Sequence, residues 1–96
     1  MNKPFIWDDS KNARLITERG VSFDEIVYCI MNGHLVDVVQ NENQDRYPGQ
    51  RIFVVNRAGY IHLVPFDESG QAIELKTIIP SRKATRKYLK GRRNET

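Results

Sequence analysis

The chain has 96 residues, 40% of them hydrophobic, and a net charge of +3, which allows one compact domain and excludes two. Its longest apolar runs, residues 52–55 and 61–65, are far shorter than the roughly 20 residues that cross a bilayer, and its N-terminus has no apolar run of signal-peptide length. Cys29 is the one cysteine, which excludes an intrachain disulfide and a cysteine cluster for zinc. We therefore expect a single cytoplasmic domain over residues 1–96, with 91–96 as a flexible tail, and with no membrane partner, metal or cofactor.

Two helices are predicted in the first third of the chain. An aspartate, Asp8 or Asp9, can cap a helix that runs to about residue 19, and Gly20 supplies the left-handed residue that commonly ends a helix. The second helix covers residues 22–32, because a serine and a glutamate three positions apart form a capping box ahead of an apolar helical pattern. Its cysteine is expected to be an inert core thiol.

Beyond these helices, β-branched and aromatic runs separated by turn residues predict an antiparallel meander. Its four strands are expected near residues 35–40, 51–56, 60–66 and 72–79, with a polar loop over 41–50. Residues 3–7 can add a short edge strand. Ser81 can cap a closing helix that runs to about residue 90. The predicted fold is α+β, with two N-terminal helices packed on a four-stranded antiparallel sheet and a basic helix at the C-terminal end.

Period-two alternation divides the third and fourth predicted strands into two faces. One face is expected to be the core beneath the two helices; it holds Ile61, Leu63, Pro65, Leu75, Thr77 and Ile79. The other face is expected to be exposed; it holds Tyr60, His62, Val64, Phe66, Glu74, Lys76 and Ile78. The closing helix would bring further cations to that exposed face, which would make a basic cleft there.

The charge is distributed unevenly along the chain. Residues 76–96 have a net charge of +7, whereas residues 1–75 have a net charge of −4. Such an asymmetry is typical of a surface that binds a polyanion, because each cation that neutralises a phosphate also releases counterions. A merely solubilising tail is the alternative interpretation.

Metal-free RNA cleavage needs a base for the ribose 2′-hydroxyl, positive charge at the phosphorane and an acid for the leaving oxygen. Arg82 and Arg86 are four positions apart, so on a helix they can bracket one phosphate. His62 titrates near neutral pH and can carry the proton, although a lone histidine in a strand is more often structural. Tyr60 and Tyr88 can stack on unpaired bases, with packing as the alternative role for Tyr88.

Several short motifs in a fixed order resemble the BrnT toxins. They are Phe-Ile-Trp-Asp at 5–8, Lys-Asn at 11–12, Arg-Gly-Val-Ser-Phe-Asp-Glu at 19–25 and Ile-Ile-Pro-Ser-Arg-Lys-Ala-Thr-Arg-Lys-Tyr at 78–88. The resemblance covers residues 5 to about 88. It implies a RelE-like fold, a ribonuclease that arrests translation, and neutralisation by an antitoxin, typically a ribbon-helix-helix protein through which the complex binds operator DNA.

The resemblance and the residue chemistry together give one set of candidate site residues. The catalytic candidates are Arg82, His62, Lys76 and Arg19, the last of which stands where many relatives have histidine. The candidates for RNA binding are Lys83, Arg86, Lys87, Tyr88 and Lys90. The alternatives to a ribonuclease toxin are a non-catalytic nucleic-acid-binding module and a subunit whose basic segment binds only an acidic partner such as the antitoxin.

Overall fold

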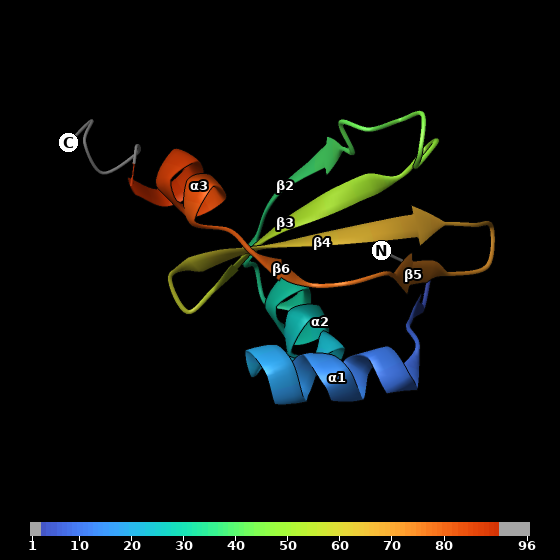
Figure 1. The fold of residues 1–96 in the computed structure, drawn as a ribbon, viewed down its shortest axis with the longest axis horizontal. Helices are drawn as coiled ribbons and strands as arrows, with labels where there is room; N and C mark the ends of the chain where they lie inside the picture. Colours follow the sequence, from blue (N-terminus) through green and yellow to red (C-terminus); the bar gives the residue numbers. More distant parts are fainter. Residues whose placement is uncertain (1–2, 91–96) are drawn as a thin grey trace.

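In a computed structural model of the protein, which describes residues 3–90, the chain folds as α+β around a mixed sheet (Figure 1). The elements in chain order are β1 (Phe5–Ile6), α1 (Asp9–Arg19), α2 (Phe23–Met31), β2 (Leu35–Gln40), β3 (Arg51–Arg57), β4 (Tyr60–Glu68), β5 (Ile73–Leu75), β6 (Ile79–Pro80), α3 (Arg82–Thr85) and the π-helical turn η1 (Arg86–Lys90). Over residues 3–90, every helix is too short or too polar to cross a membrane. The expected tail, 91–96, lies outside the described residues.

The sheet is larger than the four antiparallel strands that the sequence predicts. Its order is β1-β5-β4-β3-β2, and β6 also pairs with β4, which makes six strands. The expected edge strand forms as β1, and it pairs with β5 in parallel, whereas the other pairings are antiparallel. The central strand β4 therefore contacts β3 along one side and both β5 and β6 along the other.

The prediction of one continuous strand over residues 72–79 is wrong, because this segment forms two separate strands, β5 and β6. Leu75 lies opposite Phe66 in β4, whereas Ile79 lies opposite Leu63, so the register moves by one residue between the two pairings. One extra residue reverses which face each following side chain occupies. As a result Leu75 and Ile78, which alternation assigns to opposite faces, are buried in the same core.

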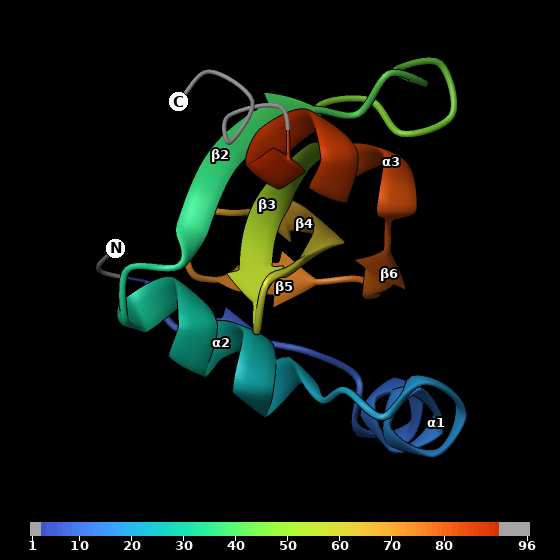
Figure 2. The same cartoon turned by 90° about the vertical axis from the view of Figure 1, so that its left-hand side faces the viewer.

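Both faces of the sheet are covered, and the predicted faces of β4 are exchanged, whereas Leu75 of β5 lies in the core beneath the two helices as predicted. Val64 and Phe66, which were expected to be exposed, form the main core with α1 and α2. Ile61, which was expected beneath those two helices, packs instead with Val54 and with Ala84 of the closing helix. Figure 2 shows α2 and α3 on opposite sides of the strands. The sheet is the middle layer of three.

The predicted helix ends are confirmed by local hydrogen bonds. Asp8, rather than Asp9, caps α1, with its Oδ1 accepting from the Ser10 amide at 2.8 Å. Gly20 ends that helix at φ 67°, in the left-handed region that favours glycine. The hydroxyl of Ser22 caps α2 by accepting from the Glu25 amide at 3.0 Å.

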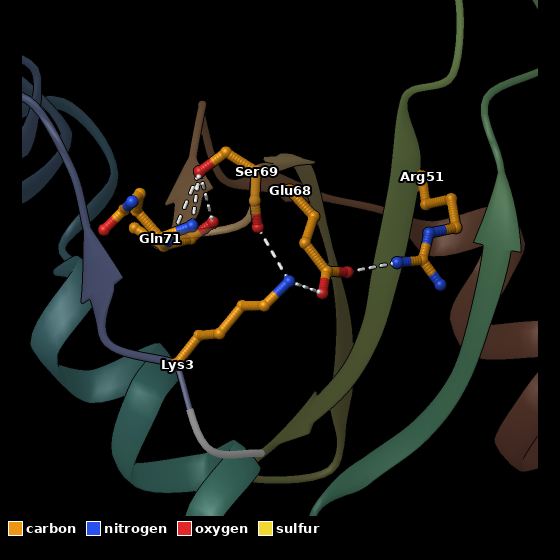
Figure 3. Close-up of polar contacts among 6 residues, drawn as sticks. Lys3, Arg51, Glu68, Ser69 and Gln71 are labelled. Carbon is orange, nitrogen blue, oxygen red and sulfur yellow. Dashed lines mark hydrogen bonds and ion pairs between the residues drawn. The ribbon is translucent and has the colours of Figure 1, made fainter.

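The N-terminal segment is attached to the far end of the sheet by charged groups (Figure 3). The Nζ of Lys3 donates to Glu68 Oε2 and to the Ser69 carbonyl oxygen, both at 2.7 Å. Arg51 of β3 pairs with the other carboxylate oxygen of Glu68. Both cations hold the pKa of Glu68 below its ordinary value, the Lys3 hydrogen bond most of all. One carboxylate of β4 thus connects β3 to the segment that precedes β1.

Candidate nucleic-acid interface

The basic C-terminal segment is a helix fixed to the central strand. The Ser81 amide donates to the Ile61 carbonyl oxygen at 3.0 Å, and the Ile61 amide donates to Thr85 Oγ1 at 2.8 Å. The Thr85 hydroxyl donates in turn to the Ser81 carbonyl oxygen at 2.7 Å. As predicted, Ser81 caps the helix, its Oγ accepting from the Ala84 amide at 3.0 Å. The orientation of the C-terminal cations is therefore set by β4.

Replacing Thr85 with valine is expected to destabilise the fold by about 1–3 kcal/mol, the usual cost of leaving a buried amide without its acceptor. Valine keeps the shape of threonine but cannot accept from Ile61, and Thr85 is only 4% exposed. Urea unfolding measures the loss. Thr85→Ser should retain most of the stability, and Thr17→Val on the exposed part of α1 should change it by less than about 0.5 kcal/mol. Equal stability of Thr85→Val and wild type would contradict this role.

A groove of about 390 Å³ lies between the closing helix and the sheet face opposite α1 and α2. Its floor is apolar and comes from three adjacent strands, and its rim is polar. The lining residues are Val39, Gln40, Asn41, Glu42, Ile52, Val54, Leu63, Ser81, Lys83, Ala84, Lys87 and Tyr88. We call this feature the helix groove. Lys83 and Lys87 are four positions apart, and the side chains of both border it.

Tyr88 joins the closing helix to the edge strand β2 across the helix groove. Its hydroxyl donates to Asp37 Oδ2 at 3.1 Å, and the Nζ of Lys87 lies 5.3 Å from the centroid of its ring. Burial raises the pKa of the Tyr88 phenol, and the hydrogen bond to Asp37 and the charge of that carboxylate raise it further. The phenol therefore stays neutral near pH 7 and offers an aromatic surface beside the cations.

Glu42 is the carboxylate among the described residues that line the helix groove. The loop that bears it is closed at its base, where the Asn41 amide donates to the Gln50 carbonyl oxygen at 2.9 Å and their side chains hydrogen-bond at 2.8 Å. Sequence reasoning treated residues 41–50 only as a polar loop and missed this glutamate. No sequence signal identifies it, because its position depends on how the 41–50 loop folds.

Arg82 and Arg86 are exposed and lie outside the lining of the helix groove, on the row of the helix next to Lys83 and Lys87. Bracketing of one phosphate by this pair stays a prediction. The first turn of α3 contains two cations and no acid. Because cations at a helix N-terminus oppose the helix dipole, Arg82 and Lys83 slightly weaken the helix through that dipole. The side chain of Lys90 lies outside the described residues.

His62 does not lie with the C-terminal cations. It is 4% exposed and faces α2, with its Nδ1 3.1 Å from the Tyr60 carbonyl oxygen. Burial lowers the pKa of His62, against the hydrogen bond to Tyr60, which raises it; nearby Arg57 lowers it and Glu25 raises it by smaller amounts. The predicted place of His62 on an exposed face is wrong, because that face packs against the helices.

Acid is expected to weaken the fold through His62. A histidine whose native pKa lies below its unfolded value of about 6.5 contributes stability that is complete above that pH and is lost as the pH falls toward the native pKa. Urea unfolding at pH 7.5 and pH 5 measures this loss. His62→Asn, whose amide can still donate to Tyr60, should lose less stability over the same interval, whereas His34→Asn at an exposed position should behave as wild type. Identical pH dependence in His62→Asn and wild type would contradict the assignment.

The two remaining catalytic candidates lie away from the helix groove. The Nη1 of Arg19, at the end of α1, donates to the Ile78 carbonyl oxygen. Lys76 is exposed, and its Nζ lies 3.4 Å from Glu74 Oε2. The structure thus separates the expected single cluster into the cations of the closing helix, the cations near α1, and a buried histidine.

A second hollow, of about 320 Å³, lies at the far end of the sheet near Phe53 and Phe66. Its two cations, Lys3 and Arg51, are both paired with Glu68 (Figure 3), so it attracts an anion less than the helix groove does.

Residues 3–90 hold no group of three His, Cys, Asp or Glu side chains placed to bind a metal ion. Burial raises the pKa of the Cys29 thiol, and the charge of Glu25 adds to this.

Comparisons of the chain with protein-family models, with curated proteins and with solved structures gave no match.

Proposed function

We propose that this protein is a metal-independent endoribonuclease of the BrnT-like toxin class, with a RelE-like arrangement, and that an antitoxin neutralises it. The observation that carries the proposal is the attachment of the basic helix to β4 through Ser81 and Thr85, beside the helix groove. A solubilising tail needs no such fixed position. A surface that places phosphates for cleavage does, because rate depends on orientation of the reacting groups.

In the proposed mechanism, single-stranded RNA lies along the closing helix. Lys83 and Lys87 hold phosphates at the rim of the helix groove, and Tyr88 offers a surface on which a base can stack. Glu42 takes the proton of a ribose 2′-hydroxyl, whose oxygen attacks the adjacent phosphorus. Arg82 stabilises the charge on the phosphorane, and the departing 5′-oxygen takes a proton from a rim ammonium group.

The experiment that tests this proposal uses purified protein and end-labelled single-stranded RNA in the presence of EDTA. The expected products are a 2′,3′-cyclic phosphate and a 5′-hydroxyl, since the 2′-oxygen is the nucleophile. An RNA with one 2′-deoxynucleotide at the cut site should resist cleavage at that position alone. Products with other ends, or cleavage at the deoxy position, would overturn the mechanism. Binding without any product would favour the non-catalytic nucleic-acid-binding module.

The apolar floor of the helix groove favours a second occupant for the same surface, an inhibitory segment of the antitoxin. Ile52 and Leu63, which are half-buried on the floor, fit apolar side chains, and the lysine rim fits acidic ones. We therefore propose that antitoxin and RNA compete for the helix groove. Expression of the chain alone should arrest growth and degrade RNA, and the antitoxin should reverse both. A neutralised complex that still cuts RNA at the free protein's rate would contradict the competition.

A further inference from the structure

A second group of cations belongs to α1, far along the chain from the cations of the closing helix. There Lys11, Arg14 and Arg19 surround a recess of about 50 Å³ that is mostly polar. Its other lining residues are Leu15, Glu18 and Thr77. We call it the α1 recess. A recess of this volume exceeds the roughly 10–15 Å³ of such space that one water needs and is far below the roughly 300 Å³ of a typical organic-ligand pocket, which suits one small anion.

The positions of the three cations are set by the fold. Lys11 and Arg14 are three positions apart in α1, so they lie on one side of the helix, and buried Leu15 holds that side against the sheet. The hydrogen bond from Arg19 to the Ile78 carbonyl oxygen fixes the guanidinium at the end of the helix. Thr77 completes the recess because it lies in the segment where the register of the sheet shifts between β5 and β6.

The α1 recess has an excess of positive charge. Lys11, Arg14 and Arg19 face one carboxylate, that of Glu18, and within residues 3–90 none of the three forms an ion pair. Like charges held together without a counterion repel, and a bound anion relieves that repulsion. Arginine presents a fork of N–H donors that matches a phosphate, and the threonine hydroxyl adds one more donor. Phosphate is therefore the anion that the donor set fits best.

We propose that the α1 recess is a phosphate-binding site, and that in the RNA complex it holds a backbone phosphate several nucleotides from those on the closing helix. In Figure 2, α1, β6 and α3 follow one another along the same side of the molecule. Thr77 and Arg82 are five residues apart, a span of at most about 18 Å. Lys76 lies on the same connection. The assignment of RNA as the source of the phosphate rests on the proposed function. The binding of phosphate by the α1 recess does not depend on that function.

The test measures affinity for fluorescently labelled single-stranded RNA as a function of salt. Arg14→Gln and Lys11→Gln should each weaken binding and should each lower the salt slope by about 0.7, the value for one phosphate contact on a single strand. Arg46→Gln, which removes the same charge from the exposed 41–50 loop, should leave the slope unchanged. Glu18→Gln should strengthen binding severalfold, whereas Asp9→Asn, with the same gain of charge on the same helix but outside the recess, should not. Partial unfolding of a variant would weaken RNA binding, so it cannot explain stronger binding by Glu18→Gln.

A second arm uses inorganic phosphate, with acetate at equal ionic strength as the control, and follows backbone amide shifts by NMR. Phosphate should move the signals of Arg14 and Thr77 more than acetate does, and more than it moves those of Tyr47. If RNA does not bind while phosphate shifts the recess, the proposed function fails and the recess stands as a phosphate site. If RNA binds while the recess variants match Arg46→Gln and phosphate shifts nothing there, the recess proposal is overturned and the proposed function stands. Equal shifts with acetate would indicate a general anion or acidic-peptide surface and would also overturn it.

Discussion

Arg82→Ala is expected to lower the rate of RNA cleavage by about 10²–10³-fold, the usual cost of removing one group that stabilises transition-state charge. The loss should come from chemistry and not from unfolding. Arg82 is exposed, and as a cation in the first turn of α3 it opposes the helix dipole, so alanine should leave the urea midpoint unchanged or slightly higher. Single-turnover cleavage of end-labelled RNA measures the effect.

Two further variants separate charge from geometry at this position. Arg82→Lys keeps the charge but loses the bidentate fork, so its rate should fall between those of wild type and Arg82→Ala. Arg46→Ala, in the exposed 41–50 loop, should cleave at the wild-type rate. Cleavage by Arg82→Ala at the wild-type rate would remove this arginine from the mechanism. It would leave Lys83 and Lys87 as the groups that face the phosphate.

The double variant Lys83→Gln, Lys87→Gln is expected to bind RNA at least a hundredfold more weakly, because a hydrogen bond to a charged group contributes about 1.5–3 kcal/mol and two are lost. Both lysines border the helix groove, where the apolar floor partly excludes water. The salt slope of binding should fall by about 1.4, which corresponds to two phosphate contacts on a single strand. Fluorescence anisotropy at several salt concentrations measures both quantities.

The matched control for this pair keeps the charge. Lys83→Arg, Lys87→Arg should retain both the affinity and the salt slope, since arginine also binds phosphate. If the glutamine variant kept the wild-type slope, RNA would contact another surface, and the α1 recess would then be the principal anion site. If both double variants lost affinity equally, shape and not charge would govern the helix groove.

Much of the candidate interface could be predicted from the sequence, but not its arrangement. The uneven charge and the serine cap at position 81 predicted a basic C-terminal helix, and that helix is present. The sequence could not distinguish Lys83 and Lys87, which border the helix groove, from Arg82 and Arg86, which do not. The rotation of a helix about its axis depends on what it packs against, here Ile61 and its neighbours in β4.

The register shift and the division of the site into separate groups of residues could not be predicted from the sequence either. Period-two alternation holds only while the register holds, and one extra residue between β5 and β6 changed which side chains share a face. Thr77 lies beside α1, where Lys11 and Arg19 form a separate recess. Glu42 entered the helix groove only through the folding of its loop.

The sequence by itself determined the helix ends, the strand β2 and the concentration of positive charge near the C-terminus. Caps and turns depend on residues within three or four positions of one another, so local chemistry suffices to specify them. Only the tertiary structure decided which layer covers which face of β4. Both faces of that strand are apolar, so burial alone does not distinguish them, and contacts between distant segments placed His62 beneath α2 and the basic helix on the opposite side.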